Sequence, residues 1–266
     1  MSTDKKQVIN TIQDNGGLGC VIRYRFVKGE TVRYISHLDM LHTFERAVRR
    51  AHIPISYSRG YNPHPSLIFG MALSLGVSSE CEAMDMGLAE KCEIDVTLDK
   101  ANKALPMDLQ LLDGQFTPPK NSIMAAVYAG TYALLVETEG GTSKIAEAIN
   151  KMMASDEVIA IKKSKDSSKE VNIKHMIKGL EAWDYTGHDC DTRIFKRPEH
   201  PAVAAIADAW AMTLDREAGQ LTVIKLDCTM GCKDNLRPDM FMNALSTVCG
   251  QDVRCIKIHK SEMHYN

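Results

Sequence analysis

The segment 60–65, with the sequence GYNPHP, combines two side chains that bind ligands or carry protons with a restricted backbone. Its two prolines flank His64 and push Asn62 and His64 out of helical geometry into extended or turn conformations. Rigid loops are frequent positions for binding and catalytic groups. We interpret the segment either as a structural turn, in which both side chains hydrogen-bond backbone amides, or as one edge of a ligand or metal site that also includes Arg59 and His37.

Arginine is concentrated in the same region. Residues 42–50 place His42, Arg46 and Arg49 three or four positions apart, so they would project together from one helical face. Seven arginines lie within 37 residues, although the whole chain has a net charge of −2: Arg23, Arg25, Arg33, Arg46, Arg49, Arg50 and Arg59. This segregation predicts a local surface for phosphates or RNA. The alternative is a solvated helix face with an internal Glu45–Arg49 pair.

A helix-start signal precedes these arginines. Ser36 and Asp39 fit a capping pattern in which the Ser36 side chain accepts a hydrogen bond from the amide of Asp39. His37 would then lie in the first helical turn, where the helix dipole disfavours the imidazolium form and leaves a ring able to exchange a proton near pH 7. His37 and His64 are therefore our candidate catalytic residues, with an ordinary surface histidine as the alternative for His37.

Motifs of high specificity for a metal, a nucleotide or a nucleophile are absent from the sequence. Cys228 and Cys232 form only part of a radical S-adenosylmethionine (SAM) cluster motif, because Asn235 occupies the third cysteine position. A polar segment contains four zinc-binding residue types at spacings that match no standard site: His188, Cys190, Asp191 and His200. We therefore expect no cofactor and no resident metal.

The composition is that of an ordinary globular protein, with 44% hydrophobic and 25% charged residues in 266. A near-neutral charge gives no global attraction to nucleic acid or acidic lipid. The chain has eight cysteines, which indicate reduced thiols in the cytoplasm because no secretory signal is evident. Apolar runs are too short to cross a bilayer, so no membrane partner is expected.

The periodicity predicts an α+β protein built from two ferredoxin-like (split β-α-β) sandwiches, each with an antiparallel sheet covered by helices. Alternation predicts strands at 21–27 and 128–139, whereas three-to-four spacing predicts a helix at 38–51. Further strands are predicted at 55–57, 67–75, 83–88 and 92–96. We expect a polar leader at 1–19, a first domain at 20–116, a linker at 117–120 and a second domain at 121–266.

The segment 21–86 resembles the uncharacterised bacterial "radical SAM-linked protein" family. The resemblance is carried by RYISHLD (33–39), ERAVRR (45–50), GYNPHP (60–65), LGVSSE (75–80) and Asp85, and it is dense over about 20–110. Domains of this family occur alone or at the C-terminus of cobalamin-binding-type radical SAM proteins. The resemblance therefore implies a separate radical SAM enzyme as a partner.

Three functions are compatible with these observations. The first is a non-catalytic accessory protein that presents RNA, or an RNA-bearing substrate, to a radical SAM enzyme for RNA modification or processing; phosphate would be held by Arg33, Arg46, Arg49 and Arg59, and specific contacts made by Asn62 and His64. The second is an RNA-directed hydrolase or ribonuclease-like enzyme with His37 and His64 as base and acid. The third is a protein-interaction module for the radical enzyme.

Overall fold

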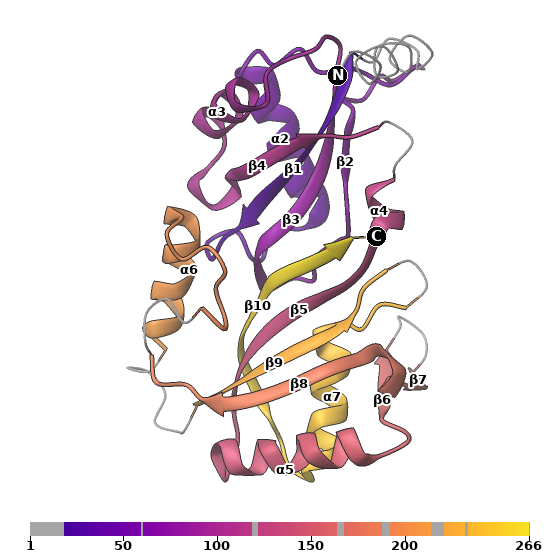
Figure 1. Cartoon of the computed structure of the whole chain (residues 1–266), viewed down its shortest axis with the longest axis vertical. Helices are drawn as coiled ribbons and strands as arrows, with labels where there is room; N and C mark the ends of the chain where they lie inside the picture. Colours follow the sequence, from indigo (N-terminus) through magenta and orange to yellow (C-terminus); the bar gives the residue numbers. More distant parts are fainter. Residues whose placement is uncertain are drawn as a thin grey trace, which may run out of the picture. The chain divides into compact units, whose positions relative to one another are not determined.

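A computed structural model describes residues 19–59, 61–118, 122–163, 168–187, 192–213, 221–231 and 234–265. The chain forms two compact units, of which unit 1 comprises Met1–Leu75 and Cys81–Ala126, and unit 2 comprises Gly76–Glu80 and Val127–Asn266 (Figure 1). Most of the predicted leader lies outside the described residues, as do residues 119–121, which include the second half of the predicted linker. Among the described residues, no helix is both long enough and apolar enough to cross a membrane.

Unit 1 alternates strands and helices in the order β-α-β-β-α-β. Its elements are β1 (Cys20–Lys28), α2 (His37–Arg50), β2 (Leu67–Phe69), most of β3 (Val77–Leu88), α3 (Ile94–Ala104), the 3-10 helix η1 (Met107–Leu109), β4 (Leu111–Phe116) and α4 (Ile123–Ala126). The strand order is β4-β1-β3, and β2 pairs antiparallel with residues 84–86 of β3. The sheet is thus assembled from strands that are distant in sequence.

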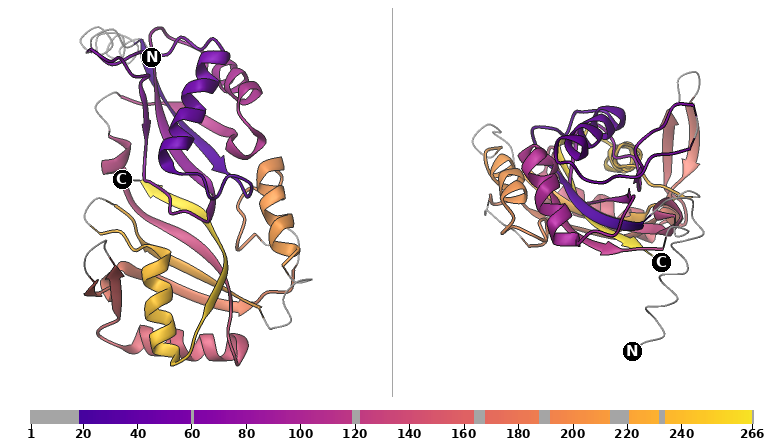
Figure 2. Two further views of the ribbon diagram at one scale, coloured as in Figure 1. Left: turned by 180° about the vertical axis from the view of Figure 1, so that it is seen from behind. Right: turned by 90° about the horizontal axis from the view of Figure 1, so that it is seen from above.

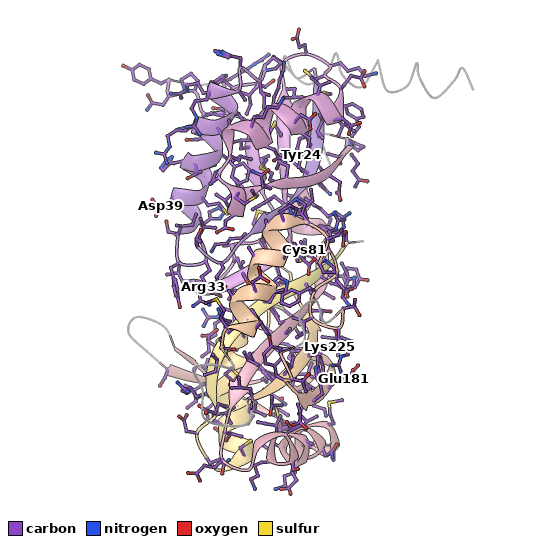
Figure 3. All side chains as sticks on the ribbon, turned by 90° about the vertical axis from the view of Figure 1, so that its left-hand side faces the viewer. Tyr24, Arg33, Asp39, Cys81, Glu181 and Lys225 are labelled. Carbon is purple, nitrogen blue, oxygen red and sulfur yellow. The ribbon has the colours of Figure 1, made fainter. Side chains whose placement is uncertain are left out.

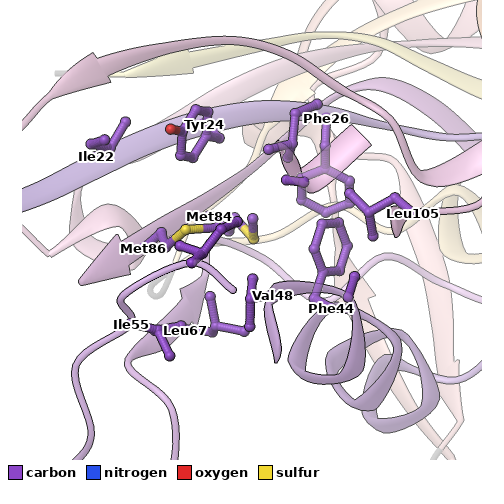
Figure 4. Packing of buried hydrophobic residues seen from close by; sticks show 14 of the residues in the cluster. Ile22, Tyr24, Phe26, Phe44, Val48, Ile55, Leu67, Met84, Met86 and Leu105 are labelled. Carbon is purple, nitrogen blue, oxygen red and sulfur yellow. The ribbon is translucent and has the colours of Figure 1, made fainter. Parts of the chain in front are cut away.

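The core of unit 1 lies between this sheet and its two longer helices. Because Met40, Phe44, Ala47 and Val48 recur every three to four residues, α2 buries one face against the strands. Figure 4 shows Phe44 next to Phe26, whose ring centroids are 5.1 Å apart in an edge-to-face arrangement. The opposite face of α2 is left exposed, and it carries the arginines.

Among its described residues, unit 2 contains three helices and the remaining strands of the same eight-stranded sheet. Its elements are β5 (Val127–Glu137), α5 (Gly141–Ala154), β6 (Ile159–Lys163), β7 (Ser168–Asn172), the 3-10 helix η2 (Lys174–Met176), β8 (Ile177–Asp184), α6 (Pro201–Ala211), β9 (Leu221–Thr229), α7 (Pro238–Cys249) and β10 (Arg254–Tyr265). The strand order is β10-β5-β9-β8, and the first residues of β3 pair parallel with β10. Strands β6 and β7 form a separate hairpin, and α5 packs beside α7 (Figure 2).

The predicted α+β class is confirmed. Unit 2 also follows the order β-α-β-β-α-β once the β6–β7 hairpin and α6 are set aside, but the duplication of two equivalent sandwiches stays a prediction. Some local predictions were wrong: residues 92–96 do not form a strand, because Ile94 begins helix α3. The strand predicted at 67–75 ends at Phe69, and residues 55–57 make only isolated bridges.

Candidate nucleic-acid interface

The start of α2 is fixed by the predicted cap. The Asp39 amide donates a hydrogen bond to Ser36 Oγ at 3.2 Å, and Ser36 Oγ donates to Asp39 Oδ2 at 2.7 Å. The exposed Asp39 side chain is labelled in Figure 3. His37 is the first residue of the helix, and its ring packs edge-to-face on Phe69, with 5.5 Å between the centroids. Ring packing therefore orients His37 over β2.

The loop at 57–65 is a hairpin. Tyr57 and Pro65 form an antiparallel bridge, the Ser58 amide donates to the His64 carbonyl at 2.8 Å, and the His64 amide donates to Ser58 Oγ at 2.9 Å. These bonds use the backbone of His64 and leave its side chain exposed, as are those of Arg59 and Asn62. The hairpin thus exposes polar side chains to solvent while hydrogen bonds hold its backbone. Gly60 lies outside the described residues.

The two candidate catalytic histidines make different contacts. His37 touches Phe69, whereas His64 is held only through its backbone. In the described part of the chain the two imidazoles make neither a hydrogen bond nor a ring contact with each other. Their joint action as base and acid stays a prediction.

Three of the seven arginines are paired with carboxylates. Arg23 makes a bidentate pair with Asp85, at 2.6 and 2.8 Å, and Arg25 makes a similar pair with Asp113. Both pairs join β1 to a neighbouring strand. Arg33 contacts Glu30 at 3.0 Å, and its guanidinium lies over the ring of Tyr34. Arg50 donates to the carbonyl oxygen of Ala104 at 2.6 Å.

Three other arginines remain available to an anion. Arg46, Arg49 and Arg59 are exposed, and Arg46 makes only a long hydrogen bond of 3.5 Å to Thr43 Oγ1. The side chains of Arg49 and Arg59 have no hydrogen-bond or ion-pair partner among the described residues. The Glu45–Arg49 pair of the alternative interpretation does not form, because Glu45 contacts His42 Nδ1 at 3.1 Å instead. The phosphate contacts stay a prediction, and these three side chains are the ones left exposed for them.

Sequence reasoning missed the exposed aromatic residues. Tyr61 is fully exposed at the hairpin, with a relative exposure of 101%, and Tyr34 and Tyr57 are at least half exposed. A signal was present, because each tyrosine lies in a polar segment within two residues of Arg33 or Arg59. Exposed aromatic rings beside cations are the side chains on which unpaired bases stack.

The described residues contain no group of three or more His, Cys, Asp or Glu side chains placed to hold a metal ion. Of the candidate zinc ligands, His188, Cys190 and Asp191 lie outside the described residues, as does Cys232. Burial lowers the pKa of His200, which caps α6 through its side chain.

Comparison with known proteins gives a family match and a distant likeness of fold. A family model described as "Uncharacterized protein conserved in bacteria (DUF2344)" matches residues 22–209. A crystal structure of a Cbf5–Nop10–Gar1 complex matches with a TM-score of 0.47 and 8% identity, over 93% of this chain and 50% of that chain. An archaeal box H/ACA sRNP Nop10–Cbf5 complex matches with a TM-score of 0.42, 8% identity, and coverage of 93% and 49%. The chain thus spans about half the length of these structures. No curated protein matches.

Proposed function

The chain belongs to the DUF2344 family of uncharacterised bacterial proteins, and we propose that it binds single-stranded RNA, or an RNA-bearing substrate, through unit 1 and presents it to a separate radical SAM enzyme. The observation that carries the proposal is the contrast between the arginines. Arg23 and Arg25 each form a bidentate ion pair with a carboxylate. In contrast, the side chains of Arg46, Arg49 and Arg59 are exposed, and none of them pairs with a carboxylate among the described residues.

The exposed arginines of α2 and the exposed tyrosines of the 57–65 hairpin are close together along the chain. The link between α2 and the hairpin is residues 51–56, which span at most about 20 Å even when fully extended. A protein that binds single strands without strong sequence preference uses backbone-directed cations together with aromatic rings, over roughly 4–16 nucleotides. One short single-stranded RNA would be long enough to contact both Arg49 and Tyr61. The radical SAM partner rests on the family resemblance described above.

Loss of Arg46 and Arg49 should weaken binding in a salt-dependent way. The Arg46→Ala/Arg49→Ala variant is expected to bind a mixed-sequence single-stranded RNA more weakly at low salt. Each lost phosphate contact should reduce the slope of log affinity against log salt by about 0.7, so both together should reduce it by about 1.4. Fluorescence anisotropy over a range of salt concentrations measures this slope.

The matched control removes two arginines that pair with carboxylates in unit 2. Arg237 contacts Asp239, and Arg254 contacts Glu137. Arg237→Ala/Arg254→Ala changes the net charge equally but should leave the slope unchanged. An equal loss in both double variants would mean that only net charge matters. No measurable RNA binding by the wild-type chain would refute the proposal.

Tyr61 should contribute by stacking. Tyr61→Ala is expected to weaken RNA binding by about 1–3 kcal/mol, which is roughly a 5- to 150-fold loss of affinity. Tyr61→Phe keeps the ring and should bind nearly as well as wild type. Tyr128→Ala, which removes an exposed tyrosine of unit 2, serves as the control. If Tyr61→Phe loses as much affinity as Tyr61→Ala, the hydroxyl rather than the ring is responsible.

A further inference from the structure

Two cysteine thiols of unit 1 converge on one carbonyl oxygen. Cys20 Sγ lies 3.7 Å from the backbone oxygen of Glu90, and Cys92 Sγ lies 3.7 Å from the same atom. The two sulfur atoms are therefore at most about 7.4 Å apart. In addition, the backbone of Cys92 acts on the Cys20 thiol and lowers its pKa, against the larger effect of burial. Each cysteine thus faces the chain segment that carries the other.

The backbone between these cysteines is closely packed. The Gly19 amide donates to the Leu88 carbonyl at 2.7 Å, which joins the start of β1 to the end of β3. A Cβ atom at Gly19 would lie 2.4 Å from the Cα of Glu90, so only glycine allows this approach. The segments that carry the two cysteines are thus in direct backbone contact.

The two thiols differ in exposure. Cys20 is buried, whereas Cys92 is half-exposed. Neither cysteine forms a disulfide in this structure. We propose that Cys20 and Cys92 form a redox-sensitive dithiol that closes to a disulfide when unit 1 meets a peroxide. This inference does not depend on RNA binding.

The chemistry proceeds in two balanced steps. The more exposed Cys92 thiol loses its proton to solvent, and the thiolate attacks one peroxide oxygen; the O–O bond breaks, hydroxide leaves and takes up that proton to become water, and the sulfur becomes a sulfenic acid. The Cys20 thiol then attacks the sulfenic sulfur, a second water leaves, and the S–S bond forms. The two thiols lose two electrons and two protons in total, and the peroxide is reduced to water.

Charged neighbours act on both thiols. Burial raises the pKa of Cys20, against a smaller opposing effect of Lys91. Burial also raises the pKa of Cys92, and the Glu90 carboxylate raises it further, while Lys100 opposes the change. The thiolate fraction is consequently small at neutral pH, so oxidation should be faster at pH 8.5 than at pH 7.

A disulfide here would enclose the candidate interface. The closed loop would run from Cys20 to Cys92 and would include α2 and the 57–65 hairpin. All of the candidate site residues, from Arg33 to His64, lie between the two cysteines. Oxidation would therefore restrict the segment that carries the interface without modifying any of its side chains.

Peptide mass spectrometry of the peroxide-treated full chain tests the proposal. After free thiols are blocked and the protein is digested with trypsin, Cys20 lies in QVINTIQDNGGLGCVIR and Cys92 in CEIDVTLDK. We expect these peptides to appear linked, with a mass about 2 Da below their sum because two hydrogens are lost, and to separate with dithiothreitol. The linked species should be absent from both Cys20→Ser and Cys92→Ser.

The other cysteines supply the control. Burial raises the pKa of Cys228 and of Cys255 to about 12. These two thiols should therefore react with the blocking reagent only after the protein is unfolded. Cys255→Ser should form the Cys20–Cys92 link as wild type does. Oxidation of Cys92 to sulfinic acid in folded wild-type protein without the link would overturn the proposal. Equal linkage of Cys92 to several other cysteines would also overturn it.

Discussion

Replacing His259 by alanine is expected to lower the free energy of unfolding by about 3–5 kcal/mol, because it leaves a buried carboxylate without its charged or hydrogen-bonding partner. His259 Nε2 lies 3.1 Å from Glu80 Oε1, and the two side chains are 0% and 1% exposed. His259 Nδ1 lies 3.0 Å from Ser78 Oγ, and Glu80 Oε1 also accepts the Lys196 amide. The pair thus joins β3, β10 and the segment before α6 within unit 2.

The second carboxylate oxygen of Glu80 makes this site sensitive to the loss of His259. Glu80 Oε2 is buried and has no hydrogen-bond partner among the described residues. Without His259, Oε1 would keep only the Lys196 amide and Oε2 would still have no donor, so a buried carboxylate would be left without its histidine partner. A serine, a histidine and a glutamate in contact are also typical of nucleophilic catalysis, but full burial keeps any substrate away from this set. We therefore assign it a structural role.

Tryptophan fluorescence is the appropriate measurement for unit 2. Both tryptophans of the chain, Trp183 and Trp210, lie in that unit, so urea unfolding followed by their emission reports on it alone. His264→Ala is the matched control, because His264 is exposed and lies 3.8 Å from Glu262; it should cost less than about 1 kcal/mol. The Glu80→Leu/His259→Leu variant should recover part of the loss. Equal costs for His259→Ala and His264→Ala would contradict the prediction.

Local pattern was enough to predict much of the fold. Helix α2 is specified by local signals, namely the spacing of Met40, Phe44 and Val48 and the cap at Ser36. Each of these signals involves residues only a few positions apart. At Ile94 and Val96, β-branched residues favoured a strand, but the apolar spacing through Ala101 and the packing of that face produced helix α3. Propensity was therefore a poor guide where tertiary packing opposed it.

The state of the arginines could not be predicted in the same way. Asp85 is 62 residues from Arg23, and Asp113 is 88 residues from Arg25. Which carboxylate meets which arginine depends on strand register, and register is set by the whole sheet. The same reason hid the contact between His259 and Glu80, which are 179 residues apart. In contrast, the exposure of Arg49 follows from helix periodicity alone, and so it was predictable.

Asp85 provides the second large expected effect, in unit 1. Asp85→Ala is expected to destabilise this unit by about 3 kcal/mol, since it removes the carboxylate that holds the Arg23 guanidinium with two hydrogen bonds where the side chains are 9% and 12% exposed. Asp113→Ala removes a carboxylate of the same bidentate geometry from Arg25, but those side chains are 41% and 46% exposed. It should therefore cost less than about 1 kcal/mol.

Hydrogen exchange separates these two variants and also tests the division of the arginines. Peptides from β1 and β3 should exchange faster in Asp85→Ala than in Asp113→Ala, because local opening is governed by the stability of the unit that contains them. If both variants exchange alike, burial does not decide the strength of these pairs. At a temperature where both are folded, neither change should weaken RNA binding, because Arg23 and Arg25 pair with carboxylates in the sheet, whereas the proposed interface consists of Arg46, Arg49 and Arg59. A gain in RNA affinity after Asp113→Ala would instead show that Arg25, once released from its carboxylate, belongs to the same surface.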